Sequence, residues 1–179
     1  MLFVFREKNI SYVKNLWLKG LGIGNGFVSA EDQSLYADYV NALTYLTESQ
    51  YEEFQEYDNA LLKALEQKNY SDALVHSQKA LHFLVSEVMN LTNIYDFTYN
   101  ENFLTNHEYV CYLQQPRIRR AIHAGNAAFN TGHQSYNQLN QTIMVSKKAW
   151  LSKALERGIE VLIYNGNLDV IVNVPGTNK

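Results

Sequence analysis

One carboxylate near the end of the chain is placed where a sheet protein could use it for chemistry. Asp169 follows VLIYNGNL, in which the apolar run predicts a buried strand and Asn165-Gly166 predicts a turn. In α/β sheets, binding and catalytic groups lie just past the carboxyl ends of the strands. Asp169 is therefore a candidate site residue, although an aspartate that only forms a turn fits the same position.

Residue types that usually accompany a catalytic acid are present but form no recognisable arrangement. No serine lies in G-x-S-x-G, the strand–turn–helix sequence that exposes a catalytic hydroxyl. The one cysteine, Cys111, lies in the apolar run YVCYL, which favours a small buried side chain over a reactive thiolate. No two of the five histidines have the four-residue spacing of a helical zinc pair, and His133 is not favoured as a catalytic residue. Arg117, Arg119 and Arg120 fit a solvated helix face better than an anion site.

Composition and charge limit the classes to which the protein can belong. Its 179 residues, 46% hydrophobic and 18% charged, suit one globular domain and argue against wholesale disorder. A net charge of −3 offers no basic surface for nucleic acid, and no apolar run approaches the roughly 20 residues that span a membrane. The sequence contains neither a dinucleotide fingerprint nor a P-loop, and we expect no metal or other cofactor.

Cysteine usage and glycosylation triplets point to different compartments. A single cysteine excludes an internal disulfide and by itself suits a cytosolic protein. Four N-x-S/T triplets favour the secretory pathway instead. They make Asn9, Asn69, Asn90 and Asn140 candidate sites of N-glycosylation.

The hydrophobic periodicity predicts the elements that would position Asp169. Strands are expected at Trp17–Gly24, with its glycines on one face, and at Glu160–Tyr164, buried on both faces. Helices are expected from Ser29 to about Leu46, from a capping box at Thr47, from a cap at Ser71, over Arg117–His123 after Pro116, and over Lys147–Arg157 before Gly158. The stretches 90–108 and 125–145 are predicted to be irregular. This order of elements indicates an α/β fold with a helical block inserted between pieces of sheet.

Three longer motifs carry a family resemblance. They are LKGLGIGNGFVSAED, YLQQPRIRRAIHAGNAAFNTG and VLIYNGNLDVIVNVPGT. In this order, from about Asn15 to Thr177, they resemble the serine carboxypeptidases, which are exopeptidases of the α/β-hydrolase fold. AIHAGNAAFNTG and YNGNLDVIVN most resemble the vitellogenic-like branch found in animals. The resemblance implies a partial α/β-hydrolase fold in one domain over residues 1–179, with residues 30–108 as an inserted helical cap.

The resemblance also implies a role for individual residues. Asp169 would be the acid of a Ser-Asp-His triad, holding the histidine ring and stabilising its protonated form. Val172 lies where the family often lines the substrate pocket. The substrates would be the C-termini of peptides or proteins, and the full-length protein would be secreted or lysosomal. Because α/β-hydrolases run in the order Ser, acid, His, the serine would precede Trp17 and the histidine would follow Lys179.

We therefore expect an internal portion of a serine carboxypeptidase that has no peptidase activity in isolation. One alternative is a non-catalytic secreted protein that binds a peptide or protein through the remaining cap and cleft. Another is a fragment that does not fold alone, because missing strands would leave sheet edges and apolar faces exposed.

Overall fold

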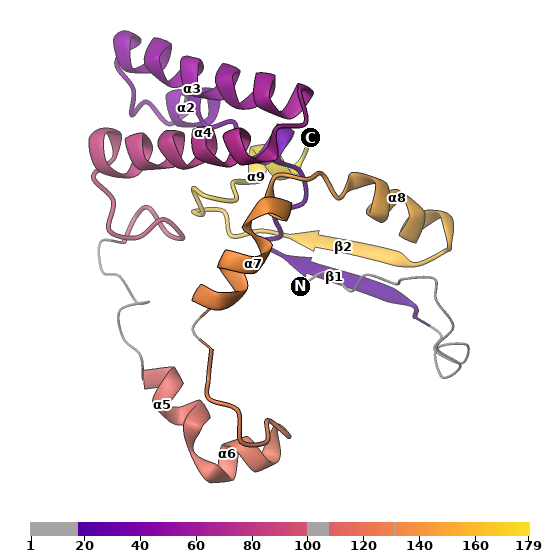
Figure 1. The fold of residues 1–179 in the computed structure, drawn as a ribbon. Helices are drawn as coiled ribbons and strands as arrows, with labels where there is room; N and C mark the ends of the chain where they lie inside the picture. The colour runs from indigo at the N-terminus through magenta and orange to yellow at the C-terminus, as the bar shows by residue number, and fades with distance from the viewer. Residues whose placement is uncertain (1–17, 100–107, 131) are drawn as a thin grey trace.

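The computed structural model describes residues 18–99, 108–130 and 132–179 (Figure 1). Strands β1 (Gly20–Gly24) and β2 (Glu160–Tyr164) pair in parallel, with Gly20 opposite Glu160 and Gly24 opposite Tyr164. The two predicted strands are thus confirmed, and segments from opposite ends of the chain lie side by side. Because both strands run the same way, the residues that follow them meet at one edge of the sheet.

The segment after β1 forms two short helices, α1 (Ala30–Gln33) and α2 (Ala37–Ala42). The single helix predicted from Ser29 to Leu46 is therefore wrong. Its interruption has a tertiary cause, since the buried carboxylate of Asp58 accepts hydrogen bonds from the backbone N–H groups of Tyr36, at 3.4 Å, and Ala37, at 3.0 Å. These bonds satisfy the free N–H groups at the start of α2, so the helix begins anew there.

Two longer helices, α3 (Glu48–Glu66) and α4 (Tyr70–His82), pack against each other. The capping box predicted at Thr47 is confirmed, because its side chain and that of Gln50 bind each other's backbone N–H. The cap of α4 is Asn69 rather than the predicted Ser71, and its Oδ1 accepts from the N–H of Asp72. The chain then continues from α4 as a π-helix (Phe83–Val88).

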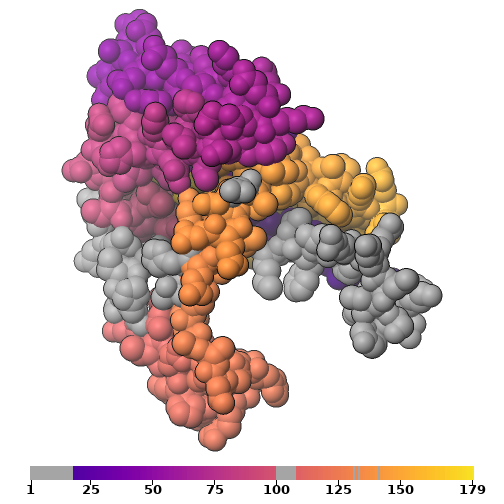
Figure 2. All heavy atoms as spheres, in the orientation of Figure 1, coloured from indigo at the N-terminus to yellow at the C-terminus, as the bar shows by residue number. Residues whose placement is uncertain are grey.

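We call α1 to α4 and the π-helix the cap helices. Their main core contains Tyr36, Phe54 and Phe83, whose rings meet at centroid distances of 6.4 Å and 5.5 Å. Val170, from the far end of the chain, is buried in the same cluster. Figure 2 shows these helices as one dense mass of atoms at the top of the view. The cap helices thus build most of their core from a continuous stretch of sequence and one distant residue.

Helices α5 (Glu108–Gln114) and α6 (Pro116–Ala121) form a pair that lies apart from the cap helices (Figure 2). The predicted first-turn position of Pro116 is confirmed. The predicted burial of Cys111 is wrong, because its side chain is exposed. The side chains of an unbroken apolar run point in all directions around a helix. Helix α5 packs mainly on α6 and has no buried residue, so part of the run faces outward.

Three further helices follow. Helix α8 (Lys148–Glu156) matches its prediction, and Gly158 follows it with a φ of +72°. Helix α7 (His133–Ile143) falls in the stretch 125–145 that was predicted to be irregular, so that prediction is wrong over the helix and confirmed over 125–130. Its sequence is rich in Asn and Gln, but it packs on α4, where Gln78 donates to the Tyr136 hydroxyl at 2.7 Å. The short α9 (Val174–Thr177) is capped by Asn173.

The sheet is much less covered than its sequence suggests. Within the described residues it has two strands, and the side chains of Leu162 and Tyr164 are 64% and 60% exposed. The prediction that β2 is buried on both faces is therefore wrong for this structure. Helix α8 precedes β2 and packs against it (Figure 1), which leaves most of the sheet surface open.

Candidate functional site

Asp169 lies in the turn that follows β2, and its side chain is only 3% exposed. Its Oδ1 accepts a hydrogen bond from the backbone N–H of Val172 at 2.9 Å. Its Oδ2 accepts from the side-chain amide of Asn25 at 2.7 Å. A buried carboxylate needs such donors, and here each oxygen has one. The geometry predicted from the strand and turn is thus present, with the carboxylate just past the carboxyl end of β2.

Asn25 reaches Asp169 because it follows β1 at the same edge of the sheet. Its N–H donates to the carbonyl of Tyr164 at 2.8 Å, and its Oδ1 accepts from the N–H of Gly166 at 3.3 Å. Asn25 is not among the candidate site residues predicted from the sequence, so its contact with Asp169 was missed. The signal that could have revealed it is its register, since the residues after two parallel strands are neighbours.

A buried tyrosine supports the turn from the side of the cap helices. The hydroxyl of Tyr36 donates to the carbonyl of Ile171 at 3.0 Å. Burial raises the pKa of Tyr36 far above its usual value, and the carboxylates of Asp58 and Asp169 raise it further. Tyr36 is therefore a neutral hydrogen-bond donor that holds the chain just after Asp169.

The loop that follows the π-helix holds the same turn from another side. The N–H of Val170 donates to the carbonyl of Ile94 at 3.0 Å, and the N–H of Phe97 donates to the carbonyl of Leu168 at 3.2 Å. Asn93 orders this loop by accepting from the N–H groups of the two residues after Ile94, Tyr95 and Asp96. The irregular backbone predicted for 90–108 is confirmed over 90–99; residues 100–107 lie outside the described residues, and Glu108 already begins α5.

The profile of the family described as serine carboxypeptidase matches residues 3–179. The chain belongs to the serine carboxypeptidase family. It is 32% identical over 172 residues to a probable serine carboxypeptidase, CPVL, of Homo sapiens, covering 90% of this chain and 36% of that protein. It is 29% identical to the venom serine carboxypeptidase of Apis mellifera, covering 97% and 39% of the two chains. Identity to the vitellogenic carboxypeptidase of Aedes aegypti is 27%, covering 89% and 36%.

A solved structure of Kex1(delta)p, described as a prohormone-processing carboxypeptidase from Saccharomyces cerevisiae, has a similar fold. The TM-score is 0.60 at 18% identity, and the match covers 89% of this chain and 38% of that one. The prediction of a partial α/β-hydrolase fold is thereby confirmed. The chain spans little more than a third of the length of the relatives and of this structure.

Val172, the other residue that the carboxypeptidase resemblance singles out, is 8% exposed. Both polar groups of its backbone are hydrogen-bonded, since its N–H donates to Asp169 and its carbonyl accepts from the side chain of Asn165 at 2.7 Å. Its side chain is thus held close to the candidate acid. A role in lining a substrate pocket stays a prediction.

The glycosylation candidates differ in their surroundings. Asn90 is exposed, with a φ of +47°, at the end of the π-helix. Asn69 is exposed but caps α4, and its Nδ2 donates to Asp72 at 2.6 Å. Asn140 is half-buried within α7, and Asn9 lies outside the described residues.

Arg119 has a specific structural role that the sequence argument missed. Its guanidinium donates to the carbonyls of Gly125 and Ala127 and to the side chain of Gln114, so it holds the loop after α6. Arg117 and Arg120 are exposed, as expected for a solvated helix face. The arginines therefore do not converge on one anion site.

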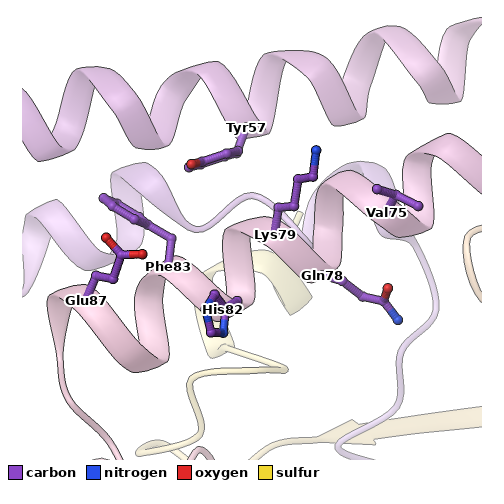
Figure 3. A pocket seen from close by; sticks show the side chains of 7 residues that line it. All are labelled: Tyr57, Val75, Gln78, Lys79, His82, Phe83 and Glu87. Carbon is purple, nitrogen blue, oxygen red and sulfur yellow. The ribbon is translucent and has the colours of Figure 1, made fainter.

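An open pocket of about 310 Å³ lies between α3 and the helix formed by α4 and the π-helix (Figure 3). It is lined by Tyr57, Val75, Gln78, Lys79, His82, Phe83 and Glu87. All of these belong to the cap helices, so the pocket is separate from Asp169.

In the part of the chain that the structure describes, no group of three or more His, Cys, Asp or Glu side chains lies close enough together to hold a metal ion. Among the same residues, no helix has the length and apolar character of a membrane span.

Proposed function

We propose that this chain is the part of a serine carboxypeptidase that provides the acid of its catalytic triad and its cap. The observation that carries the proposal is the buried carboxylate of Asp169 at the carboxyl end of β2, with a donor on each oxygen. Fixed in this way, it would accept the N–H of a histidine ring, select the tautomer and stabilise the imidazolium.

The reaction that follows is acyl transfer at the C-terminus of a peptide or protein. A serine hydroxyl would attack the last peptide bond, the histidine would take its proton, and the C-terminal residue would leave with the amine protonated by the same histidine. Water would then hydrolyse the ester. These steps use side chains and need no cofactor. The serine and histidine come from sequence outside residues 1–179, so the isolated chain has no turnover.

Residues 30–108 would form the cap over the substrate cleft. In the described part of that range, the cap helices and the loop after them adjoin the Asp169 turn, because Tyr36 from the former and Ile94 and Phe97 from the latter bind it through hydrogen bonds. Side chains on this side of the turn, Val172 among them, would then help to select the residue next to the scissile bond.

The first test combines mapping with an assay. Mass spectrometry of the native protein from its source should find peptides beyond Met1 that contain G-x-S-x-G, and peptides beyond Lys179 that contain a histidine. That longer form should release C-terminal residues from blocked dipeptides, and Asp169→Asn should lower kcat by about 10³- to 10⁴-fold.

Asp38→Asn is the matched control, because it removes an exposed carboxylate of α2 that binds Tyr51. It should leave kcat unchanged. Full activity of Asp169→Asn would refute the proposed role of Asp169. Turnover by the purified 179-residue chain would refute the assignment of the serine and histidine to sequence outside it. Saturable peptide binding without turnover by the longer form would favour the non-catalytic alternative.

The full-length protein would pass through the secretory pathway, to the outside or to a lysosome. The names of the venom and vitellogenic relatives suit this compartment, as do the glycosylation triplets. Asn90 is the strongest attachment candidate of the described part, since its side chain is exposed in an irregular segment. Secreted chain treated with a glycosidase should show a mass loss at the Asn90 peptide that Asn90→Gln abolishes. An unmodified Asn90 peptide would contradict this assignment.

A further inference from the structure

The shorter of the two hydrogen bonds to Asp169 comes from the side chain of Asn25, the residue that follows β1. Asn25 Nδ2 lies 2.7 Å from Asp169 Oδ2, which is within the range of a charge-assisted hydrogen bond. We propose that Asn25 is a positioning residue that fixes the orientation of the Asp169 carboxylate toward the triad histidine. This inference rests on the proposed function.

The hydrogen bonds of Asp169 explain why the Asn25 amide is needed to orient the carboxylate. An ionised carboxylate offers about four acceptor positions, so the bonds from Asn25 and from the Val172 N–H leave room for a histidine N–H. The carboxylate torsion of an aspartate is broad and has no strong rotamer preference. Without Asn25, a single N–H would hold one oxygen, and the other would be free to rotate away from the histidine.

Asn25 is itself held in one orientation. Its N–H donates to Tyr164, and its Oδ1 accepts from the N–H of Gly166, so the amide nitrogen must face Asp169. A flipped amide would place its oxygen against the Asp169 carboxylate and its NH2 group against the N–H of Gly166, so both hydrogen bonds would be lost. Asn25 also has a φ of +45°, a left-handed conformation that asparagine adopts more readily than most residues. Both the backbone and the side chain therefore favour asparagine at this position.

The backbone conformation determines which variants isolate the side chain. Asn25→Gly removes the amide and tolerates the positive φ, whereas alanine would add strain. Asn25→Asp keeps the shape and also tolerates this conformation, but it replaces the donor with a second carboxylate. Asn59→Ala, at an exposed position on α3, is the control.

The decisive measurement is a double-mutant cycle in the longest native form that shows carboxypeptidase activity. Asn25→Gly should lower kcat by about 10- to 100-fold with little change in KM, since it misplaces a group that acts in the transition state. In the Asp169→Asn background the same substitution should cause no further loss, because its effect passes through Asp169. An equal fractional loss in both backgrounds would overturn the proposal.

Asn25→Asp adds a pH signature that a merely structural role would not produce. Two carboxylates this close share one proton in acid, and the protonated one can again donate to its neighbour. Activity relative to wild type should therefore rise by about 10-fold or more from pH 7 to pH 5. Tyr36 and Tyr39, which also lie in electrostatic reach of Asp169, have raised pKa values and do not titrate in this range. A constant ratio of activities over this range would contradict the proposal.

The contact can also be tested without activity, which separates this inference from the proposed function. In NMR spectra of the 179-residue chain, the side-chain amide signals of Asn25 should shift in Asp169→Asn and stay in place in the exposed control Asn59→Ala. Asn25 amide signals that are unchanged in Asp169→Asn would overturn the positioning contact. A longer native form without any turnover would instead refute the proposed function and leave the contact intact.

Discussion

The cap helices and the two-stranded sheet are held together in different ways. The cap helices bury Tyr36, Phe54 and Phe83 against one another, and their helices pack along their length. The sheet pairs five residues from each strand, but Leu162 and Tyr164 stand largely in solvent. One region thus completes its own core within the described residues, and the other does not.

Asp169 follows a strand of the sheet in the sequence, but the turn that contains it packs against the cap helices. It follows β2, yet Val170 is buried in the core of the cap helices, and the two residues after Asp169 are bound by Ile94, through Val170, and by Tyr36, through Ile171. The comparison teaches that the two regions divide the work: Asn25, at the edge of the sheet, binds the carboxylate of the candidate acid, whereas the cap helices and the loop after them hold the turn that carries it. Four predictions test this difference, from the largest expected effect to the smallest.

The largest effect is expected in the core of the cap helices. Phe54 is fully buried between Tyr36 and Phe83, so Phe54→Ala should lower the free energy of unfolding by about 3–5 kcal/mol. Tyr45→Ala, at an exposed aromatic residue, should have a much smaller effect. Urea denaturation followed by circular dichroism measures both. A wild-type chain without a cooperative transition would show that the cap helices do not fold independently.

The sequence predicted those parts of the fold whose cause is local. The capping box at Thr47, the first-turn Pro116 and the helix stop at Gly158 depend on neighbours a few residues away, and all three are confirmed. The break between α1 and α2 depends on Asp58, which lies some twenty residues further along the chain. Such a tertiary cap leaves no local pattern, and the prediction of one continuous helix therefore failed.

The same distinction applies to the candidate site. The strand, the turn and the position of Asp169 follow from VLIYNGNLD, because a buried strand and its turn are local features. The donors could not be found in this way, since Asn25 precedes Asp169 by 144 residues and Tyr36 comes from α2's N-terminal cap. They become neighbours only through the parallel pairing of β1 with β2 and the packing of the cap helices.

The second prediction concerns pH. Burial raises the pKa of Asp58 to about 6, although hydrogen bonds from the N–H groups of Ala37 and Tyr36 oppose the shift. Between pH 3.8, the pKa of Asp58 in the unfolded chain, and about pH 6, its pKa in the folded chain, Asp58 is protonated when the chain is folded and ionised when it is unfolded. Stability should therefore fall as the pH rises from about 4 to about 6, by about 2–3 kcal/mol in total.

Asp58→Asn provides the matched comparison for this pH effect. It cannot ionise, so the difference between the two proteins isolates Asp58 from the other carboxyl groups. Urea unfolding should be measured at about pH 4.5, 5.5 and 6.5, which cover the titration of Asp58. The difference in the free energy of unfolding between wild type and Asp58→Asn should change steadily over this range. Parallel stability curves for the two proteins would contradict the assignment.

The third prediction concerns the link between the two regions. Tyr36→Phe removes the donor to the carbonyl of Ile171, a partly buried hydrogen bond, and should cost about 1–2 kcal/mol. Tyr51→Phe removes an exposed hydroxyl that binds Asp38, and its effect should be smaller. Hydrogen exchange should also accelerate at residues 169–172 in Tyr36→Phe and remain unchanged there in Tyr51→Phe. Unchanged exchange in both variants would mean that Ile94 and the sheet hold the turn without Tyr36.

The smallest effect is expected on the open sheet. Leu162 is 64% exposed, so Leu162→Lys should change the free energy of unfolding of this chain by no more than about 0.5 kcal/mol. The charge should also reduce self-association, because it interrupts an exposed apolar strand at the edge of a sheet. In a longer native form whose other segments cover β2, the same lysine would be buried and cost several kcal/mol. Sedimentation and urea unfolding of both forms measure these effects. A large loss in the short chain would show that its sheet is already covered, and the contrast with the cap helices would not hold.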